Sequence, residues 1–551
     1  MTTTDVISNQ YKQKFELINF RNGIVFDLSV LLICCLSLGF SWIESILSSD
    51  SVHWGVMYVQ ALDLKRGLIP YKETLTDYGI MTSLIQSFSL TLLGERLISI
   101  GLATGIFYSF NLFLSFQIFL KFLPKYAAFF STFLIFLLSG YITFPWSNYY
   151  SHTFFILSIL MLLSKNNKKN VFLSGLLLGF SLLCRYSLIQ AILPPFVLFF
   201  SSEIIFQKNT KKTTASRVLF FSLGFIFPIL LFFLFLFSNS LLDDFWIQNQ
   251  IAKSEIVGKA TILNLLQDLF QSMFITFGDD IHDSRIIFFT IIFCWNLITL
   301  FYFLNKLLFK KKLAQDEAIV MQLCVITLFG YLSGISSYDF LRLIAGSSSL
   351  GVGVIIYSVI QISQRLGRKI KIIILLPLIS ICFIWASSLI FSASATSAAY
   401  IPWRLDMLMG KGVISTEISI FRGKILSPKY YEFYREIYQK ISKYQNSHYI
   451  VNYTQDSVAM VINNLPKVQI SSYYTPLIEQ AYPEETKKIH QIINTKKAVI
   501  LSEKDLHLPG YKGIFSKTWL SGDVQWLGNR SWLGENGSDR LHISVPEKDE
   551  I

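Results

Sequence analysis

Long apolar stretches alternate with short polar connections along most of the chain, from about residue 24 to residue 391. A membrane-spanning helix needs roughly 20 predominantly apolar residues, so this pattern predicts about eleven spans, some of them short or broken. We place them near residues 24–46, 97–120, 126–144, 150–164, 171–185, 187–205, 217–237, 286–308, 317–335, 339–361 and 370–391. The pattern therefore predicts a mainly α-helical, polytopic transmembrane bundle, with a break between two helices at Arg185.

Basic residues mark one side of this predicted bundle. Lys and Arg cluster before the first span and after the second, fourth, sixth, eighth and tenth, whereas the short connections PWSNYYS and SSY contain neither. Such clusters lie on the cytoplasmic side of membrane proteins. With an odd number of spans, we expect a multi-pass protein of the bacterial inner (plasma) membrane whose N-terminus is cytoplasmic and whose C-terminal region lies outside.

Three longer polar segments then lie on the outer side: residues 47–96, 238–285 and 392–551. In the second segment, the apolar residues of ILNLLQDLFQSMF recur at helical spacing, which predicts a helix lying on the membrane surface. We divide the chain into a transmembrane domain, residues 1–391, which carries the outer loops 47–96 and 238–285, and a soluble extracytoplasmic accessory domain, residues 392–551.

The C-terminal region is patterned as a small α/β layer. The segments SPKYYEFYREIYQKISKYQ and PEETKKIHQIINTK predict helices, and HYIVNY, VQISSYY and KAVILSE predict strands. Alternation of helices and strands favours an α/β arrangement. The region contains no glycine-rich phosphate loop and no nucleophile motif, which favours an accessory or acceptor-binding role.

Composition agrees with a membrane protein. The chain is 52% hydrophobic and 15% charged, whereas a soluble chain carries roughly a quarter charged residues. The formal net charge of +12 would suggest nucleic acid as a partner of a soluble protein, but here the basic residues mark topology, and we expect no nucleic-acid binding. All six cysteines lie in predicted spans without a CxxC or Cys/His pattern, so neither a disulfide in the C-terminal region nor a cysteine-based metal site is expected.

The first outer loop carries most of the candidate chemistry. Asp50 follows the first span, where a carboxylate beside the membrane can act as a general base or remain a solvated acid at a helix end. His53 shares a face with Asp50 if this segment is helical. Asp77, Tyr78 and Gly79 form either a second contact to a substrate or a simple turn.

Six acidic and histidine residues on the outer side form a candidate oxygen and imidazole set for a divalent cation: Asp50, His53, His152, Asp279, Asp280 and His282. Their spacing matches no tight metal motif. The reaction inferred below requires no cofactor, and the cation stays an alternative.

Two arginines fall inside or at the end of predicted spans. Arg185 interrupts LLGFSLLCRYSLIQAILPP, and a charge in such a stretch is costly unless it has a function. Arg342 lies in YDFLRLIAGSSS, three residues after Asp339. An anionic lipid phosphate is a natural partner for either guanidinium, while an ion pair with Asp339 is the alternative for Arg342.

Together these motifs resemble the GT-C superfamily of integral-membrane glycosyltransferases, in the branch of the protein O-mannosyltransferases and aminoarabinose transferases. The resemblance covers roughly residues 24–391. It rests on an outer Asp after the first span, on SGLLLGFSLLCRYSLIQ and YDFLRLIAG, and on the series Gly67, Pro70-Tyr71 and Asp77-Tyr78-Gly79. The chain departs from many members in having Ser51 after Asp50 and Tyr78-Gly79-Ile80 in place of Lys-Pro-Pro.

The resemblance implies transfer of a sugar from a polyprenyl-phosphate-linked donor to an acceptor hydroxyl at the outer face. Asp50 would be the base, and a single displacement implies inversion at the anomeric carbon. The substrate-binding residues would be His53, Tyr71, Asp77, Tyr78, Arg185 and Arg342, and the acceptor a lipid, a glycan or a protein. The alternative functions are a cell-envelope polysaccharide polymerase or ligase and a lipid-linked oligosaccharide transporter.

Overall fold

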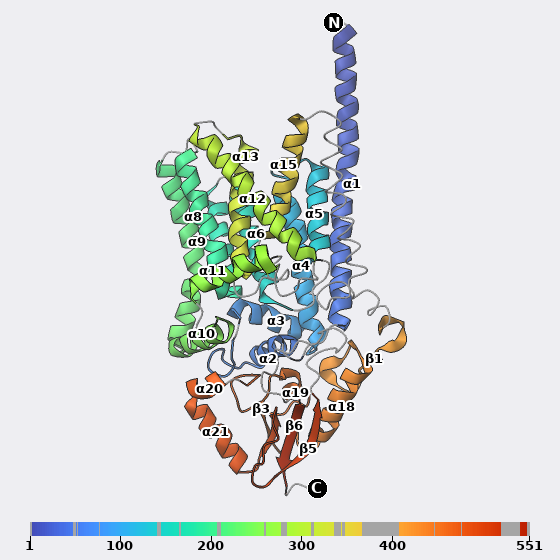
Figure 1. Cartoon of the computed structure of the whole chain (residues 1–551), viewed down its shortest axis with the longest axis vertical. Helices are drawn as coiled ribbons and strands as arrows, with labels where there is room; N and C mark the ends of the chain where they lie inside the picture. The colour runs from blue at the N-terminus through green and yellow to red at the C-terminus, as the bar shows by residue number, and fades with distance from the viewer. Residues whose placement is uncertain are drawn as a thin grey trace.

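The computed structural model describes residues 3–47, 51, 53–76, 78–139, 145–164, 167–206, 211–257, 261–276, 284–309, 313–334, 343, 348–365, 407–445, 447–474, 476–518 and 540–547. A bundle of helices makes up most of the molecule, and a small unit of helices and strands lies at the end opposite the N-terminus (Figure 1). Helices α2 and α3 lie between the two parts (Figure 1).

The bundle is built from the following α-helices: α1 (Thr3–Leu47), α2 (His53–Lys65), α3 (Ile80–Leu93), α4 (Leu97–Phe119), α5 (Lys125–Ser139), α6 (Ser147–Leu163), α7 (Lys168–Cys184), α8 (Ile189–Phe206), α9 (Lys211–Ser238), α10 (Leu242–Val257), α11 (Ile262–Gln271), α12 (Ser284–Leu308), α13 (Gln315–Gly330) and α15 (Gly351–Arg365). Short 3-10 helices η1 (Tyr186–Leu188), η3 (Tyr331–Gly334) and η4 (Ser348–Leu350) and one π-helical turn, η2 (Ser272–Thr276), join some of them.

Five helical stretches within the described residues are long and apolar enough to cross a membrane: Ile24–Leu47, Leu97–Phe119, Lys212–Ser238, Ile287–Leu308 and Gln315–Gly334. Many large apolar side chains of α1, α9 and α12 are exposed, as expected of an integral membrane protein. The predicted number of eleven spans is not confirmed, because α5, α6, α7, α8 and α15 contain only 15 to 18 residues. The predicted span 370–391 lies outside the described residues.

Glycine allows α7 and α9 to pack with their backbones almost in contact. A Cβ atom at Gly175 would lie 2.0 Å from the carbonyl oxygen of Phe221, and one at Gly224 would lie 2.1 Å from that of Phe172. Small residues at such positions are how membrane helices approach closely. This contact holds α7 firmly, and the C-terminal end of α7 carries Arg185.

The predicted surface helix in the second outer segment is confirmed as a helix, α11. Its side chains Leu263, Leu266 and Phe270 recur at helical spacing and are exposed. Its position on a membrane surface stays a prediction.

The C-terminal unit contains the helices α18 (Pro428–Ser442), α19 (Ser457–Val461), α20 (Pro476–Ala481) and α21 (Pro483–Asn494) and the strands β1 (Val413–Ile414), β2 (Ile425–Leu426), β3 (Tyr449–Tyr453), β4 (Ala498–Ser502), β5 (Tyr511–Thr518) and β6 (Arg540–Pro546), with the 3-10 helix η6 (Ser419–Phe421) and the π-helical turn η5 (Met407–Lys411). Strands β1 and β2 pair with each other, and the main sheet has the order β3-β4-β6-β5, with β3 and β4 parallel and the other pairs antiparallel. The expected small α/β layer is therefore present.

One predicted strand, VQISSYY, is wrong. Gln469 in this segment forms two hydrogen bonds through its side chain to the backbone of Asn452, of 2.7 and 2.9 Å. The amide side chain thus takes the place of a strand backbone beside β3, and residues 468–474 form no strand. Strands β5 and β6 were not predicted.

Helix α2 belongs to the hydrophobic core of the C-terminal unit although it comes from the first outer loop. Trp54 and Tyr58 are buried in one cluster with Tyr434 and Val458. A Cβ atom at Gly55 would lie 2.9 Å from Ser457, so α2 and α19 are in close contact. The division at residues 391 and 392 falls outside the described residues and stays a proposal.

Candidate functional site

Arg185 lies where α7 ends and η1 begins, as the sequence predicts. Its backbone is extended, with φ −156° and ψ 102°, so the chain turns away from the axis of α7. The half-buried guanidinium group donates hydrogen bonds to the hydroxyl of Ser187 at 3.1 Å and to the hydroxyl of Ser147 at 3.3 Å. The break therefore points a fixed cation at the first residue of α6.

Tyr78 covers this cation from the first outer loop. Its ring centre lies 5.5 Å from the guanidinium carbon of Arg185, within the range of a cation–π contact. The next residue, Gly79, donates a backbone hydrogen bond of 3.0 Å to the carbonyl of Cys184, and a Cβ atom there would lie 2.0 Å from the carbonyl oxygen of Leu183. Glycine is thus required where the loop meets the end of α7, and this contact places Tyr78 beside Arg185.

His53 approaches the same place from α2. Its ring centre lies 6.1 Å from that of Trp146, the residue that precedes α6. The structure therefore brings together three sequence-predicted residues, His53, Tyr78 and Arg185, around the N-terminus of α6. The first backbone N–H groups of a helix have no partner within it, and the helix dipole adds positive potential there, so this arrangement favours an anion.

Two buried polar side chains on one face of α6 extend this site. Asn148 is fully buried, and neither its Nδ2 nor its Oδ1 atom has a hydrogen-bond partner among the residues that the structure describes. His152, four residues later and 6% exposed, has no hydrogen-bond partner for Nδ1 in the described part of the chain. Buried polar atoms without partners cost about 1–3 kcal/mol each, so a polar ligand or a water beside this pair would stabilise it.

Tyr71 is more deeply buried than His53, Tyr78 and Arg185. It is fully buried, and its hydroxyl lies 2.9 Å from that of Tyr186, the neighbour of Arg185. Its ring packs against Phe245 and Phe232, and burial raises the pKa of Tyr71 well above its ordinary value. Tyr71 thus anchors the loop beneath the site, and direct contact with a substrate stays a prediction.

Three predicted site residues, Asp50, Asp77 and Arg342, lie outside the described residues, as do Asp279, Asp280 and His282 of the candidate cation set. The residue after Asp50 is firmly placed: Ser51 is buried, and its carbonyl accepts a 3.2 Å hydrogen bond from the backbone of Ser457. Among the residues that the structure describes, no group of three or more His, Cys, Asp or Glu could hold a metal ion. The cation alternative stays a prediction.

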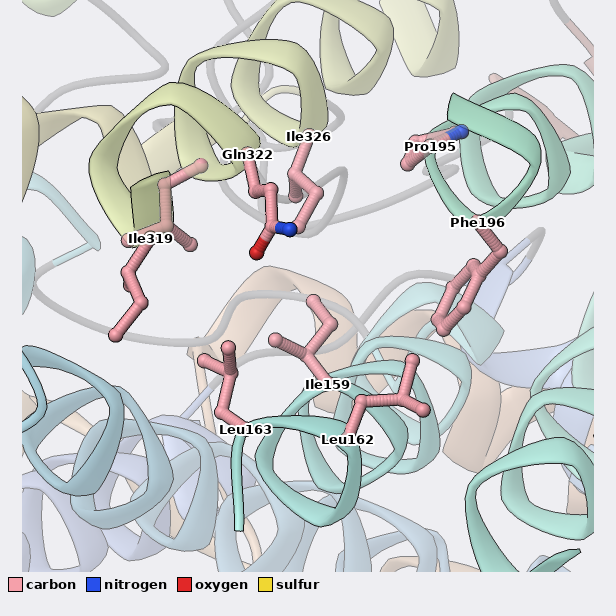
Figure 2. A pocket seen from close by; sticks show the side chains of 9 residues that line it. Ile159, Leu162, Leu163, Pro195, Phe196, Ile319, Gln322 and Ile326 are labelled. Carbon is pink, nitrogen blue, oxygen red and sulfur yellow. The ribbon is translucent and has the colours of Figure 1, made fainter. Parts of the chain in front are cut away.

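A small apolar cavity of about 20 Å³ lies between α6, α8 and α13 (Figure 2). Its lining consists of Ile159, Leu162, Leu163, Pro195, Phe196, Ile319, Gln322, Leu323 and Ile326. Ile159 lies about two turns along α6 from His152. The polar end of α6 at Arg185 is thus followed, deeper in the bundle, by an apolar cavity.

Comparisons with known proteins bear on this arrangement. The sequence matches no family model and no curated protein. A crystal structure of ArnT from Cupriavidus metallidurans bound to undecaprenyl phosphate aligns with 94% of this chain and 97% of its own, with a TM-score of 0.53 and 11% identity. The chain shares its fold with ArnT. The expected resemblance to the aminoarabinose transferases is thereby confirmed at the level of the fold.

The apo state of ArnT aligns with a TM-score of 0.53 at 12% identity, over 94% of this chain and 98% of ArnT. The oligosaccharyltransferase AglB from Archaeoglobus fulgidus, in complex with an inhibitory peptide and a dolichol-phosphate, aligns with a TM-score of 0.48 at 10% identity, over 86% of this chain and 69% of AglB.

Sequence reasoning missed Ser147, Asn148 and Tyr186. The first two stand in PWSNYYS, where a polar pair follows Pro-Trp at the head of an apolar run. This pattern is typical of a helix that begins with free N–H groups in an otherwise apolar setting, and it could have predicted a polar site at this position. The contact of Tyr186 with Tyr71 joins segments 115 residues apart and has no local signature.

Proposed function

We propose that this protein is a membrane glycosyltransferase that moves a sugar from a polyprenyl-phosphate-linked donor to an acceptor hydroxyl on the outer face of the membrane. The observation that carries the proposal is the Arg185 guanidinium group held at the N-terminus of α6 by Ser147 and Tyr78. The fold shared with ArnT, which has been crystallised with undecaprenyl phosphate, supports it.

In this proposal the donor phosphate binds between Arg185 and the first turn of α6. The guanidinium group, the Ser147 hydroxyl and the helix N-terminus all favour negative charge, which grows on the phosphate as the glycosidic bond breaks. Arg342 supplies a second cation. Asn148 and His152 donate or accept hydrogen bonds next to the phosphate, and the isoprenoid chain extends toward the apolar side of the bundle.

Asp50 acts as the base. The acceptor oxygen attacks the anomeric carbon, its proton passes to the Asp50 carboxylate, and the bond from the anomeric carbon to the phosphate oxygen breaks. The lipid phosphate leaves with the electron pair, and the anomeric carbon inverts because there is one displacement. His53 and Asp77 contact the sugar or the acceptor, and no step requires a metal ion.

The donor part of this proposal is tested by binding. Undecaprenyl phosphate is titrated into the purified full-length protein in detergent, and binding is measured for the wild type, Arg185→Gln and Arg435→Gln. Arg435 is the matched control because it is an exposed arginine paired with Glu417 on the C-terminal unit. We expect Arg185→Gln to weaken binding at least tenfold, consistent with the loss of a charge-assisted contact of about 1.5–3 kcal/mol. Equal affinity of all three proteins would contradict the assignment.

A further inference from the structure

A second cationic site lies at the other end of α2, away from Arg185. The connection between α3 and α4 faces the turn that follows η6 across a groove of about 360 Å³. The groove is lined by Gly94, Glu95, Arg96, Ser419 and Arg422. Helix α2 separates it from the candidate active site by its 13 residues, or about 18 Å from His53 to Lys65.

The groove carries an excess of positive charge. Glu95 pairs with Lys65 at 2.8 Å and with Arg66 at 4.0 Å. Neither Arg96 nor Arg422 makes an ion pair with any residue in the described part of the chain; the Arg96 guanidinium donates to the carbonyl of Leu93 at 2.5 Å. Lys65 and Arg66 thus share the Glu95 carboxylate, and the charges of Arg96 and Arg422 are left over, although basic residues are rare on the side of a membrane protein opposite its basic loops.

The two arginines stand on fixed backbone. Phe421, next to Arg422, is fully buried in the core that includes Leu97. Gly94 and Gly423 both have left-handed backbone, with φ of 91° and 89°, and a Cβ atom at Gly423 would touch Ile98. Packing of the η6 turn against the N-terminus of α4 therefore fixes the shape of the groove. The dipole of α4 adds positive electrostatic potential at the same place.

The flank of the groove is suited to lipid. On α3, Leu84, Phe88 and Leu92 form one row and are 47%, 64% and 66% exposed. The opposite face of this helix buries polar residues such as Gln86 and Ser83. Helix α3 thus exposes apolar side chains and buries polar ones, which is the reverse of the distribution on a helix at a water-exposed surface. Since α4, a candidate span, begins at the groove, we place it where the membrane surface meets water.

We propose that this groove binds the phosphate headgroup of an anionic membrane phospholipid. The lipid phosphate accepts hydrogen bonds from the guanidinium groups of Arg96 and Arg422, which suit phosphate because they present paired donors. Its acyl chains lie along Leu84, Phe88 and Leu92. The bound lipid joins the α3–α4 connection to the C-terminal unit, and the site is independent of the proposed transferase function.

The test is a lipid titration of the purified full-length protein in neutral detergent, read by the midpoint of thermal unfolding. Phosphatidylglycerol is compared with phosphatidylcholine and with soluble glycerol phosphate. The variants are Arg96→Gln/Arg422→Gln and the charge-matched control Lys487→Gln/Lys497→Gln, two exposed lysines of the C-terminal unit.

We expect phosphatidylglycerol alone to raise the midpoint, and the arginine double variant to need at least tenfold more lipid than the wild type and the lysine control. An equal response to phosphatidylcholine, or equal responses of both double variants, overturns the proposal. A response to glycerol phosphate equal to that for phosphatidylglycerol also overturns it, because it indicates a soluble anion. If the arginine double variant fails to fold, the same titration is carried out with Glu95→Gln, which removes the negative charge of the groove. Tighter binding of phosphatidylglycerol than in the wild type supports the proposal, and unchanged or weaker binding overturns it.

Discussion

At the scale of single residues, Lys424 is a buried amine with a specific setting. Its Nζ atom donates a 2.9 Å hydrogen bond to the carbonyl of Ser45, near the end of α1, and lies 4.3 Å from the ring centre of Trp54 on α2. Burial lowers the pKa of Lys424 from 10.5 to about 7, although Glu44 opposes the change. The C-terminal unit thus places a titrating group beside the segment that leads to Asp50.

This setting predicts how stability depends on pH. Between about pH 7 and pH 10.5 the unfolded chain keeps a proton on Lys424 that the folded protein has released. Because the unfolded state binds more protons, this residue makes the folded protein more stable as pH rises through that range, and the contribution is lost as pH falls through 7. In Lys424→Met, thermal unfolding from pH 7 to pH 10 should lack this rise. Parallel pH profiles of variant and wild type would contradict the prediction.

The contact of Tyr78 with Arg185 is also testable. Tyr78→Phe keeps the ring over the guanidinium group, whereas Tyr78→Leu removes it. A cation–π contact contributes about 0.5–2 kcal/mol, so Tyr78→Leu should weaken polyprenyl-phosphate binding by about twofold to thirtyfold, and Tyr78→Phe should bind nearly as the wild type. Equal losses in both variants would show that the hydroxyl, and not the ring, is what matters.

At the scale of elements, glycine contacts decide how the site is assembled. Gly79 meets the end of α7 so closely that Gly79→Ala should move the loop and separate Tyr78 from Arg185. We expect a loss of about 1–3 kcal/mol in stability and a clear loss of donor binding, because added volume at a packed contact forces the backbone to shift. Gly39→Ala on α1 is the control, since no atom of the described residues lies within 4 Å of its Cβ position. Similar unfolding midpoints for both variants would argue against the required close contact.

Elements were predictable from the sequence where one pattern dominates locally. The break at Arg185, helices α4 and α12, the amphipathic helix α11 and the strands β3 and β4 follow from runs of apolar residues and their spacing. The strand predicted at VQISSYY was wrong because the side chain of Gln469 satisfies the backbone of Asn452. The proximity of His53, Tyr78 and Arg185 at the N-terminus of α6 could not be predicted from the sequence, since it depends on contacts between segments that are distant along the chain.

At the scale of the whole molecule, a buried ion pair couples the first outer loop to the C-terminal unit. Asp63 on α2 contacts Lys467, and the hydroxyl of Thr74 donates to Asp63 at 2.8 Å. The side chains of Asp63 and Lys467 are 5% and 13% exposed. The pair holds α2 and the loop that carries Tyr78 against the unit that contains the sheet.

Breaking one side of this pair should be costly. Lys467→Met leaves the Asp63 carboxylate buried without its cation and should lower stability by about 3–5 kcal/mol, whereas Asp63→Asn/Lys467→Met should recover much of the loss. Unfolding by heat or denaturant in detergent measures both. If the double variant is as unstable as Lys467→Met, the pair does not act as a coupled unit.

We propose that this chain transfers a sugar from a lipid phosphate with Asp50 as the base. The most direct measurement is consumption of polyprenyl-phosphate sugars by the purified protein with an envelope extract as acceptor source, comparing wild type, Asp50→Asn and Asp268→Asn, an exposed acid on α11. We predict that wild type and Asp268→Asn consume a donor and that Asp50→Asn is at least about a hundredfold slower, as expected for loss of a general base. Full activity of Asp50→Asn would contradict this role of Asp50.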